Sequence, residues 1–390
     1  MSGHAKLSPS GASRWTRCPG SVALEAGYPD HTSSYAQYGS DAHHLASECL
    51  EHNVQPVDFI SEEITYLDHG EPRTFTVDKE MADGVQQYVE FCRDLGMGAD
   101  VVFVEAPVPL EHITGEEGAQ GTADFVAVTQ QADGVLTVSV CDLKFGKGVK
   151  VSAYENPQLI LYALGAVEEL DYLLDGATVE VDVFIHQPRL DTVSEFHLTL
   201  DELREWGEHF TEAAERTRDP DAPRVPGEVQ CRFCKARHDC PDLRRHVLEA
   251  AESDIELLED LGEVLPKLKM IRDWCASVEA RAIERLEAGD EVPGWKLVEG
   301  RSSRAWPDQD RVVKAAKSAK LKLDEYMPRS LLSVAQLEKH LGKGDFAARF
   351  GDLVIRKPGR PTLAPASDPR PSIHSADALG FENLENEDVA

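Results

Sequence analysis

Two carboxylates and an ammonium group stand near the ends of two neighbouring apolar runs in the middle of this sequence. Residues 121–144 alternate apolar and polar side chains on either side of an Ala-Asp-Gly turn signal, which predicts two strands joined by a tight turn. Side chains alternate across a strand, so Asp142 and Lys144 share a face with Val140. Asp124 lies on the apolar face of the first strand. Pairing of the two strands therefore brings both aspartates together at one end of a sheet, with the lysine beside them.

Such a group of side chains is suited to metal-assisted chemistry. Two adjacent carboxylates repel each other unless a cation lies between them, and hard oxygen ligands select Mg2+ or Mn2+. A neighbouring lysine can hold an attacking water or stabilise a developing phosphate charge. Asn156 and Pro157 then begin a helix, as cap and first-turn residue. Gln158 and Tyr162 are four residues apart on it, so their polar ends share one face and can reach the same site.

Three cysteines near the middle of the chain have the spacing of metal ligands. Cys231, Cys234 and Cys240 form a C-x2-C-x5-C run, and three thiolates do not complete a four-coordinate site. The fourth ligand must come from elsewhere. Either His238 supplies it, giving a zinc knuckle, or Cys18 does. Eight cysteines in a chain that we expect to be cytoplasmic favour metal or cluster ligands over disulfides.

The strand and helix motifs together resemble the PD-(D/E)xK nuclease superfamily, in its RecB-like branch. That family carries an Asp after the glycine of one strand, D/E-x-K on the next strand and Q-x-x-x-Y on the following helix. The residues that match are Asp124, Asp142, Leu143, Lys144, Gln158 and Tyr162. The resemblance implies an α/β fold: a restriction-endonuclease-like core with a mixed central sheet flanked by helices, and a helical C-terminal extension.

The same resemblance implies a set of metal ligands. In the RecB-like branch a G-x-x-x-H helix before the core supplies one ligand, and Gly39 and His43 have that spacing whereas His44 does not. The implied ligands of Mg2+ or Mn2+ are His43, Asp124, Asp142 and the backbone carbonyl of Leu143. In some relatives a glutamate before the core orients the site. Glu105 stands there, but we expect it to be a strand-edge carboxylate that faces solvent.

The cysteines also resemble a feature of this branch. Cys18 near the N-terminus, with Cys231, Cys234 and Cys240 after the core, is similar to the iron–sulfur staple of AddB-type helicase-nucleases and CRISPR-associated exonucleases. The resemblance implies a 4Fe–4S cluster that ties the two ends of the core together. Zn2+ is the alternative.

The resemblance implies a metal-dependent DNA exonuclease that hydrolyses phosphodiester bonds at DNA ends. The catalytic residues would be Asp124, Asp142, Lys144, Gln158 and Tyr162. The motifs are also similar to phage- and prophage-borne RecB-like proteins, which implies DNA recombination or repair beside a single-strand annealing protein. The alternatives are a catalytically inactive DNA-binding or scaffold protein of nuclease fold, and a zinc-stapled regulator.

The remaining elements follow from hydrophobic periodicity and capping signals. We expect strands at 101–110, 177–187, 194–199 and 295–299. We expect helices at 35–52, 79–97, 200–218 and 253–287, and a short capped helix within 7–24 that ends near Cys18-Pro19-Gly20. The predicted organisation is a nuclease domain over 1–245, a helical extension over 246–360 and a disordered tail over 361–390.

Charge sets a limit on how this chain could bind DNA. The 40 Lys and Arg against 70 Asp and Glu give a net charge of −30, which argues against a general nucleic-acid coat. Residues 301–360 are different, with 14 Lys and Arg against 7 Asp and Glu, a net +7. They are a candidate DNA contact, with an ordinary solvated helical surface as the alternative. No apolar run of membrane-spanning length appears, and we expect no membrane partner.

Overall fold

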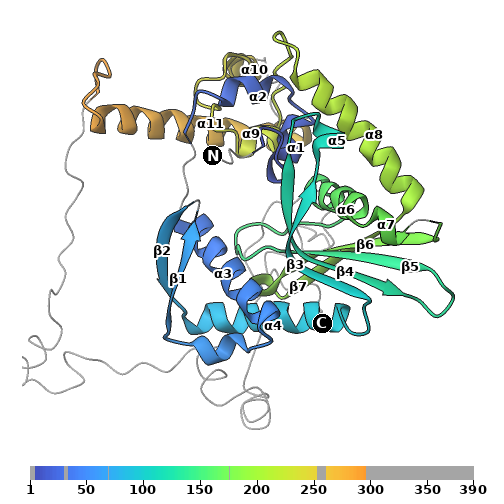
Figure 1. The fold of residues 1–390 in the computed structure, drawn as a ribbon. Helices are drawn as coiled ribbons and strands as arrows, with labels where there is room; N and C mark the ends of the chain where they lie inside the picture. The colour runs from blue at the N-terminus through green and yellow to red at the C-terminus, as the bar shows by residue number, and fades with distance from the viewer. Residues whose placement is uncertain (1–4, 30–33, 69, 175, 253–260, 296–390) are drawn as a thin grey trace, which may run out of the picture. The chain divides into compact units, whose positions relative to one another are not determined.

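A five-stranded mixed sheet lies at the centre of the computed structural model (Figure 1), with the strand order β3-β4-β5-β6-β7. The strands are β3 (Val101–Pro109), β4 (Gln120–Gln130), β5 (Leu136–Leu143), β6 (Val179–Gln187) and β7 (Thr192–Thr199). β5 and β6 pair in parallel, and the other neighbours pair antiparallel. The strands expected before 295 are confirmed to within two residues, and so is the mixed α/β class.

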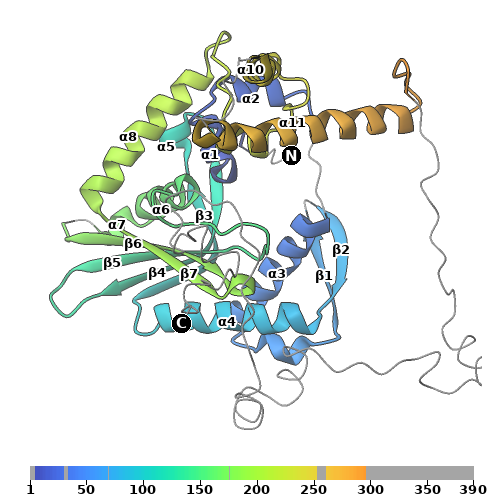
Figure 2. The ribbon, with the colours of Figure 1, turned by 180° about the vertical axis from the view of Figure 1, so that it is seen from behind.

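The two faces of the sheet carry different helices. Alternate residues of β4 and β5, such as Val126 and Val140, pack under α6 (Pro157–Glu169) and α8 (Leu200–Thr217) in one core cluster. The intervening residues pack against α3 (Ser34–Glu51) and α4 (Lys79–Leu95) in a second cluster, which contains Phe125, Cys141 and Leu143. Figure 2 shows α4 and α8 on opposite sides of the sheet. The sheet is therefore a layer between two groups of helices.

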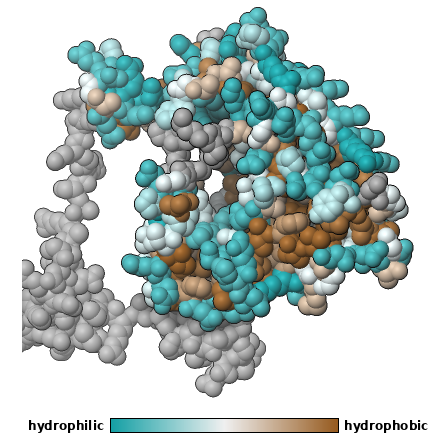
Figure 3. All heavy atoms as spheres, in the orientation of Figure 1, coloured by the Kyte–Doolittle hydropathy of each residue, from teal (hydrophilic) through white to brown (hydrophobic). Residues whose placement is uncertain are grey.

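The helices expected at 35–52, 79–97 and 200–218 are confirmed as α3, α4 and α8. In α8 the buried residues Leu203, Gly207, Phe210 and Ala214 recur at helical spacing. Figure 3 shows that the outer side of this helix is hydrophilic, whereas apolar side chains gather over the neighbouring strands. The pattern of buried residues therefore accounts for the way α8 lies on the sheet.

A second, two-stranded sheet was not predicted from the sequence. Strands β1 (Glu63–Asp68) and β2 (Glu71–Thr76) pair as an antiparallel hairpin. The hairpin is joined to α3 by a partly buried ion pair, in which the Arg73 guanidinium donates to both oxygens of Asp41 at 2.6 and 2.7 Å. The ring of His44, also on α3, stacks on Tyr66 with 4.4 Å between centroids. The hairpin and α3 are thus held as one piece.

Residues 7–24 contain three short helical turns, with a break near Cys18-Pro19-Gly20, where the expected helix was predicted to end. These are η1 (Pro9–Gly11), α1 (Ala12–Trp15) and α2 (Gly20–Glu25). The break falls at Cys18-Pro19, because a proline has no N–H to continue the helical hydrogen bonds and its ring clashes with the preceding turn. The break frees Cys18 from a regular helix.

The remaining elements are short, apart from the last two helices. They are η2 (Pro56–Phe59), α5 (Glu111–Thr114), α7 (Asp171–Leu174), η3 (Pro188–Leu190), α9 (Glu228–Arg232), α10 (Pro241–Glu252) and α11 (Leu261–Glu287). In the part of the chain that the structure describes, no helix combines the length and the apolar character needed to cross a membrane.

The structure describes residues 5–29, 34–68, 70–174, 176–252 and 261–295. All of them belong to the first of two compact units, Met1–Val298 and Glu299–Ala390. Several expectations lie outside the described residues: the start of the last helix at 253–260, the basic segment 301–360 and the tail 361–390. Of the strand expected at 295–299 only Trp295 is described, and it lies outside any strand.

Candidate functional site

Three acidic residues lie level with one another on three adjacent strands. The pairs Val104–Phe125 and Ala106–Ala123 in β3 and β4 flank Glu105 and Asp124 and place them opposite each other. The pair Phe125–Cys141 ends the ladder between β4 and β5, and one further step places Asp124 opposite Asp142. Opposed residues of neighbouring strands have nearby side chains. The register thus brings three carboxylates to one level of the sheet.

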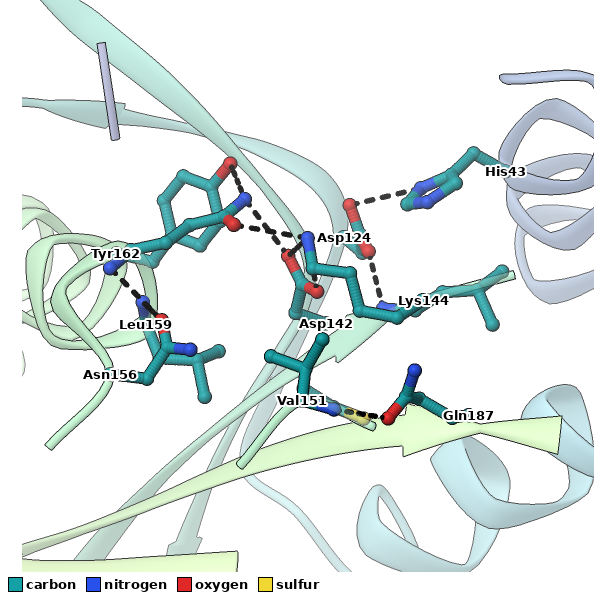
Figure 4. A network of polar contacts seen from close by, with 12 residues as sticks. His43, Asp124, Asp142, Lys144, Val151, Asn156, Leu159, Tyr162 and Gln187 are labelled. Atoms are coloured by element: carbon teal, nitrogen blue, oxygen red, sulfur yellow. Dashed lines mark hydrogen bonds and ion pairs between the residues drawn. The ribbon is translucent and has the colours of Figure 1, made fainter. Parts of the chain in front are cut away.

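The Asp124 side chain bonds to the backbone of β5 just beyond the last pair of the β4–β5 ladder. Its Oδ2 accepts a hydrogen bond from the backbone N–H of Leu143 at 2.7 Å, so the strand end keeps a partner without the ladder. Its Oδ1 lies 3.2 Å from Nδ1 of His43 on α3. Figure 4 shows both contacts. The structure therefore brings His43 to the aspartates, as the G-x-x-x-H spacing led us to expect. The predicted role of the Leu143 carbonyl stays a prediction.

Asp142 is the most buried of these acids, with 2% of its surface exposed. The Lys144 ammonium lies 3.0 Å from its Oδ1 and 2.7 Å from its Oδ2. The same ammonium donates to Oε1 of Gln158 at 3.0 Å. The Gln158 amide in turn donates to Asp142 Oδ1 at 3.2 Å and to the Tyr162 hydroxyl at 3.0 Å. One closed network thus contains all four side chains (Figure 4).

The start of α6 fixes the position of this network. The Asn156 side chain caps the helix by accepting from the backbone N–H groups of Gln158 and Leu159, as the Asn-Pro signal predicted. Further along, a Cβ at Gly121 would lie 3.0 Å from the Tyr162 ring and 2.9 Å from Pro9. Only glycine therefore lets β4 approach the Tyr162 ring this closely.

The expectation that Glu105 faces solvent is wrong. Its carboxylate lies in a group with His43 and Asp124 whose potential ligand atoms are all within 4.8 Å of one another. Its backbone is left-handed, with φ of 49°, in the middle of a strand. This conformation costs a non-glycine residue about 1 kcal/mol or more, and such costs concentrate at functional sites. The unusual backbone explains why strand alternation failed to predict the position of this side chain.

The charges in the site perturb one another strongly. Burial lowers the pKa of the His43 imidazole, but the charges of Asp124 and Asp142 outweigh it and raise that pKa to about 9. Burial and the charge of Asp124 raise the pKa of Glu105 to about 7. Burial also raises the pKa of Asp142, with Lys144 opposing the shift. For Asp124 burial acts upward, but His43 and Lys144 prevail and lower its pKa. Bound protons and the Lys144 ammonium thus compensate the negative charge of the three carboxylates.

The net negative charge of the site matches the charge of a divalent cation. Three carboxylates and the Lys144 ammonium sum to −2 when His43 is neutral, the form in which an imidazole binds metals. Carboxylate oxygens are the ligands of Mg2+ and Mn2+, and an imidazole nitrogen is compatible with first-row metals. The side chains of His43, Glu105 and Asp124, whose potential ligand atoms lie within 4.8 Å of one another, therefore fit one divalent cation. Asp142 is outside that group and is paired with Lys144.

The four predicted cluster cysteines line a single cavity. Cys18 comes from the N-terminal segment, Cys231 from α9, Cys234 from the turn that follows, and Cys240 from the start of α10. Three of the sulfurs accept backbone N–H bonds: Val225 to Cys18 at 3.2 Å, Gly227 to Cys231 at 3.4 Å and Leu243 to Cys240 at 3.4 Å. Hydrogen bonds to sulfur favour the thiolate, which is the metal-binding form.

Three of these thiols have raised pKa values. Burial raises the pKa of Cys18 and of Cys231. Burial and the Glu25 carboxylate raise the pKa of Cys234 to about 12. Converging buried thiols that hold their protons become thiolates only with a cation to compensate them. The cavity therefore has the chemistry of a metal or cluster site.

The alternative fourth ligand, His238, lies elsewhere. It is absent from the residues that line the cysteine cavity. Its Nε2 is 3.3 Å from Asp239, and its ring packs on Tyr28 with 5.2 Å between centroids. The structure thus brings Cys18, and not His238, to the other three cysteines.

The N-terminal segment is held tightly against the cysteine region. The Gly20 N–H donates to Pro223 O at 3.0 Å, and a Cβ at Gly20 would lie 2.4 Å from Ala222 O. Glu25 accepts from the backbone N–H of Lys235 at 2.7 Å. These contacts bring Cys18 to partners more than two hundred residues away in the sequence.

Comparison with known proteins identifies the family. The family described as "Protein of unknown function (DUF2800)" matches residues 4–371. The chain belongs to the DUF2800 family. Among solved structures, the crystal structure of SSO0001 is similar to 60% of this chain and 84% of its own, at 14% identity and a TM-score of 0.26. A similarity at that score supports no structural or functional argument.

Proposed function

We propose that this protein is a divalent-metal-dependent deoxyribonuclease of the PD-(D/E)xK superfamily, in its RecB-like branch, acting as an exonuclease on DNA ends. The observation that carries the proposal is the network in which Asp142 and Lys144 meet Gln158 and Tyr162. Asp124 lies beside it, bonded to the backbone N–H of Leu143. These are the residues by which the sequence resembles that superfamily. Action at ends, and work beside a single-strand annealing protein in phage or prophage recombination, rest on the resemblance alone.

The metal of the proposal is Mg2+ or Mn2+, held by Asp124, Asp142, His43 and the Leu143 carbonyl. The structure adds Glu105, whose carboxylate is in reach of the same ion. When bound, such an ion supplies Lewis acidity toward the phosphodiester and the attacking water. The His43 proton must leave before the imidazole can bind it, since a metal ligand is neutral imidazole.

Lys144 has the role of an electrostatic catalyst in this proposal. Its ammonium is anchored by Asp142 and Gln158, with 28% of its side chain exposed. A cation held in a partly buried site can stabilise charge that develops on a phosphate without reorganising. Gln158 keeps the ammonium in place, and Tyr162 fixes the Gln158 amide through its hydroxyl. Gln158 and Tyr162 therefore act as positioning residues.

We further propose a 4Fe–4S cluster on Cys18, Cys231, Cys234 and Cys240. A tetrahedral Zn2+ with bonds of about 2.3 Å needs sulfurs about 4 Å apart. Among the described residues, the His43 group is the set of three potential ligands whose atoms all lie within 4.8 Å of one another, and no three of these sulfurs form another. The wider spacing supports a multi-iron cluster over a single zinc ion.

The test is a nuclease assay on end-labelled linear DNA and on covalently closed circular DNA, with Mg2+, Mn2+ or EDTA. We expect metal-dependent loss of the linear substrate, none of the circle, and no cleavage in EDTA. Asp142→Asn should abolish cleavage. Lys79→Ala, which removes an exposed lysine paired with Asp83, is the matched control and should cleave normally. Protein that leaves both substrates intact with either metal would be a scaffold of nuclease fold.

A further inference from the structure

The loop between Lys144 and Gln158 has a charge unlike that of the rest of the chain. Residues 144–157 contain three lysines and one acidic residue, Glu155, in a chain whose net charge is −30. Lys147 forms an ion pair with Glu80 on α4, and Lys150 is exposed. Lys144 is also paired, with Asp142, so the exposed Lys150 is the lysine of this loop best placed to attract a phosphate. This loop is therefore suited to meet a polyanion beside the candidate site.

The loop is held firmly although it has no regular secondary structure. Gln187 at the end of β6 accepts from the Val151 N–H at 2.7 Å and donates to Val149 O at 3.0 Å. The first of these bonds appears beside the acidic site in Figure 4. The Ser194 hydroxyl on β7 accepts from the Ala153 N–H at 2.9 Å. Side chains from the neighbouring strands β6 and β7 thus fix the loop backbone.

Tyr154 projects from this fixed loop. Its surface is 63% exposed, and its ring packs at 65° against Phe196 of β7 with 5.0 Å between centroids. Its hydroxyl donates to the Glu155 carboxylate, which raises the pKa of the phenol. Four residues separate it from Gln158, so it lies at most about 14 Å from that residue along the chain. An aromatic ring is therefore held in the open within reach of the site.

We propose that residues 147–154 form a platform for an unpaired polynucleotide strand, on which Tyr154 stacks a base and Lys150 contacts a phosphate. The platform gives the proposed nuclease a single-stranded substrate at its site, and it rests on that proposed function. Proteins that bind single strands combine basic grooves with exposed aromatic rings, because every base has a stacking face. A base inside a duplex already has both faces stacked and cannot offer one to Tyr154.

The geometry also relates the platform to the chemistry. The loop begins directly after Lys144 and ends directly before Gln158, and these two side chains are joined at 3.0 Å. A strand that lies along the loop is therefore led to the Asp142–Lys144 pair. Tyr154 is a binding residue in this arrangement and takes no part in bond breaking.

The test measures binding without cleavage, by fluorescence anisotropy in EDTA. The probes are fluorescein-labelled oligothymidylate, oligouridylate and a duplex of mixed sequence. Tyr154→Ala should weaken binding of oligothymidylate by about 5- to 150-fold, the range for loss of one base stack, and should leave duplex binding unchanged. Tyr154→Phe should bind like wild type. Tyr172→Ala, at a tyrosine 73% exposed on α7, is the matched control and should bind normally.

Salt dependence tests the lysine. Lys150→Ala should lower the slope of log affinity against log salt by about 0.7, the value for one phosphate contact to a single strand. Equal losses with oligouridylate mean that the platform accepts either sugar, which agrees with the stacking mechanism. Unchanged binding in Tyr154→Ala, equal loss on the duplex, or no binding of any single strand by wild type would each overturn the platform. If single-strand binding depends on Tyr154 but the protein does not cleave DNA, the platform is supported and the proposed nuclease function is refuted.

Discussion

Replacement of Lys144 by methionine separates two functions of one ammonium group. In the structure this group lies 2.7 and 3.0 Å from the oxygens of Asp142, whose surface is 2% exposed. Without it, Asp142 keeps the Gln158 amide at 3.2 Å as its side-chain donor among the described residues. Methionine preserves most of the buried stem. The change therefore tests the charge more than the packing.

The expected loss of stability in EDTA is about 3 kcal/mol. Removing one partner of a buried ion pair costs about 3–5 kcal/mol, since the other charge is left uncompensated. Proton uptake limits the cost, because burial already raises the pKa of Asp142. A carboxyl whose folded pKa is raised binds protons more tightly in the folded state. The deficit of Lys144→Met should therefore grow as the pH rises above the ordinary aspartate pKa of 3.8.

A divalent cation should reverse this deficit but leave the loss of turnover. Mn2+ compensates Asp142 as the ammonium did, so saturating Mn2+ should restore most of the stability. Cleavage should remain about a hundred- to a thousand-fold slower, the usual cost of losing one contact that stabilises transition-state charge. Stability is measured by urea unfolding with circular dichroism, and Lys79→Met is the surface control. Wild-type stability in EDTA together with wild-type turnover would refute the assignment of Lys144.

Three further predictions concern separate parts of the molecule. In EDTA, the free energy of unfolding should fall as the pH rises from about 4.5 to about 7, because the pKa of Glu105 is raised in the folded state. Glu105→Gln should remove this fall, as measured by urea unfolding at several pH values between 4.5 and 7. Anaerobically purified protein should be brown with about four irons per chain; Cys18→Ala should bleach it, whereas the exposed Cys275→Ala should keep its iron by colorimetric analysis. Asp41→Ala should break the partly buried ion pair with Arg73 and lower stability by about 1–3 kcal/mol, the usual cost of leaving a polar partner unsatisfied. It should also weaken Mn2+ binding, measured by calorimetry, because the helix that carries His43 loses a contact with the hairpin. Unchanged Mn2+ affinity would show that the hairpin does not position α3.

The aspartates and the lysine could be predicted together because each depends on a strong local pattern. Strand alternation placed Asp142 and Lys144 on one face, and the short turn fixed the pairing that puts Asp124 opposite. The Asn-Pro signal located the start of α6, from which Gln158 follows by helical spacing. Cys18 was placed by resemblance, since its partners are distant in the sequence. A local sequence pattern carries no information on a contact between residues so far apart in the chain.

Glu105 and the hairpin show where such reasoning fails. A glutamate with a left-handed backbone has no signature in its residue type, so alternation assigned it to solvent. The hairpin strands alternate weakly, and the glycine at their turn, with φ of 86°, was the available signal. The Asp41–Arg73 pair joins two elements that only tertiary packing brings together. These features depend on the fold as a whole, and the sequences of their own segments carry little signature of them.

The packing of the N-terminal segment has a consequence for the order in which the chain assembles. Residues 14–25 contact residues 223–235, so the ribosome synthesises the first segment long before the second. Joining Cys18 to Cys231 closes a loop of 213 residues (231 − 18), whose entropic cost is about 5 kcal/mol by the logarithmic law. The central sheet lies wholly inside that loop and can form first, which lowers the cost by bringing the two segments near. The contacts of Cys18, Gly20 and Glu25 with Val225, Pro223 and Lys235 can therefore form only late in synthesis.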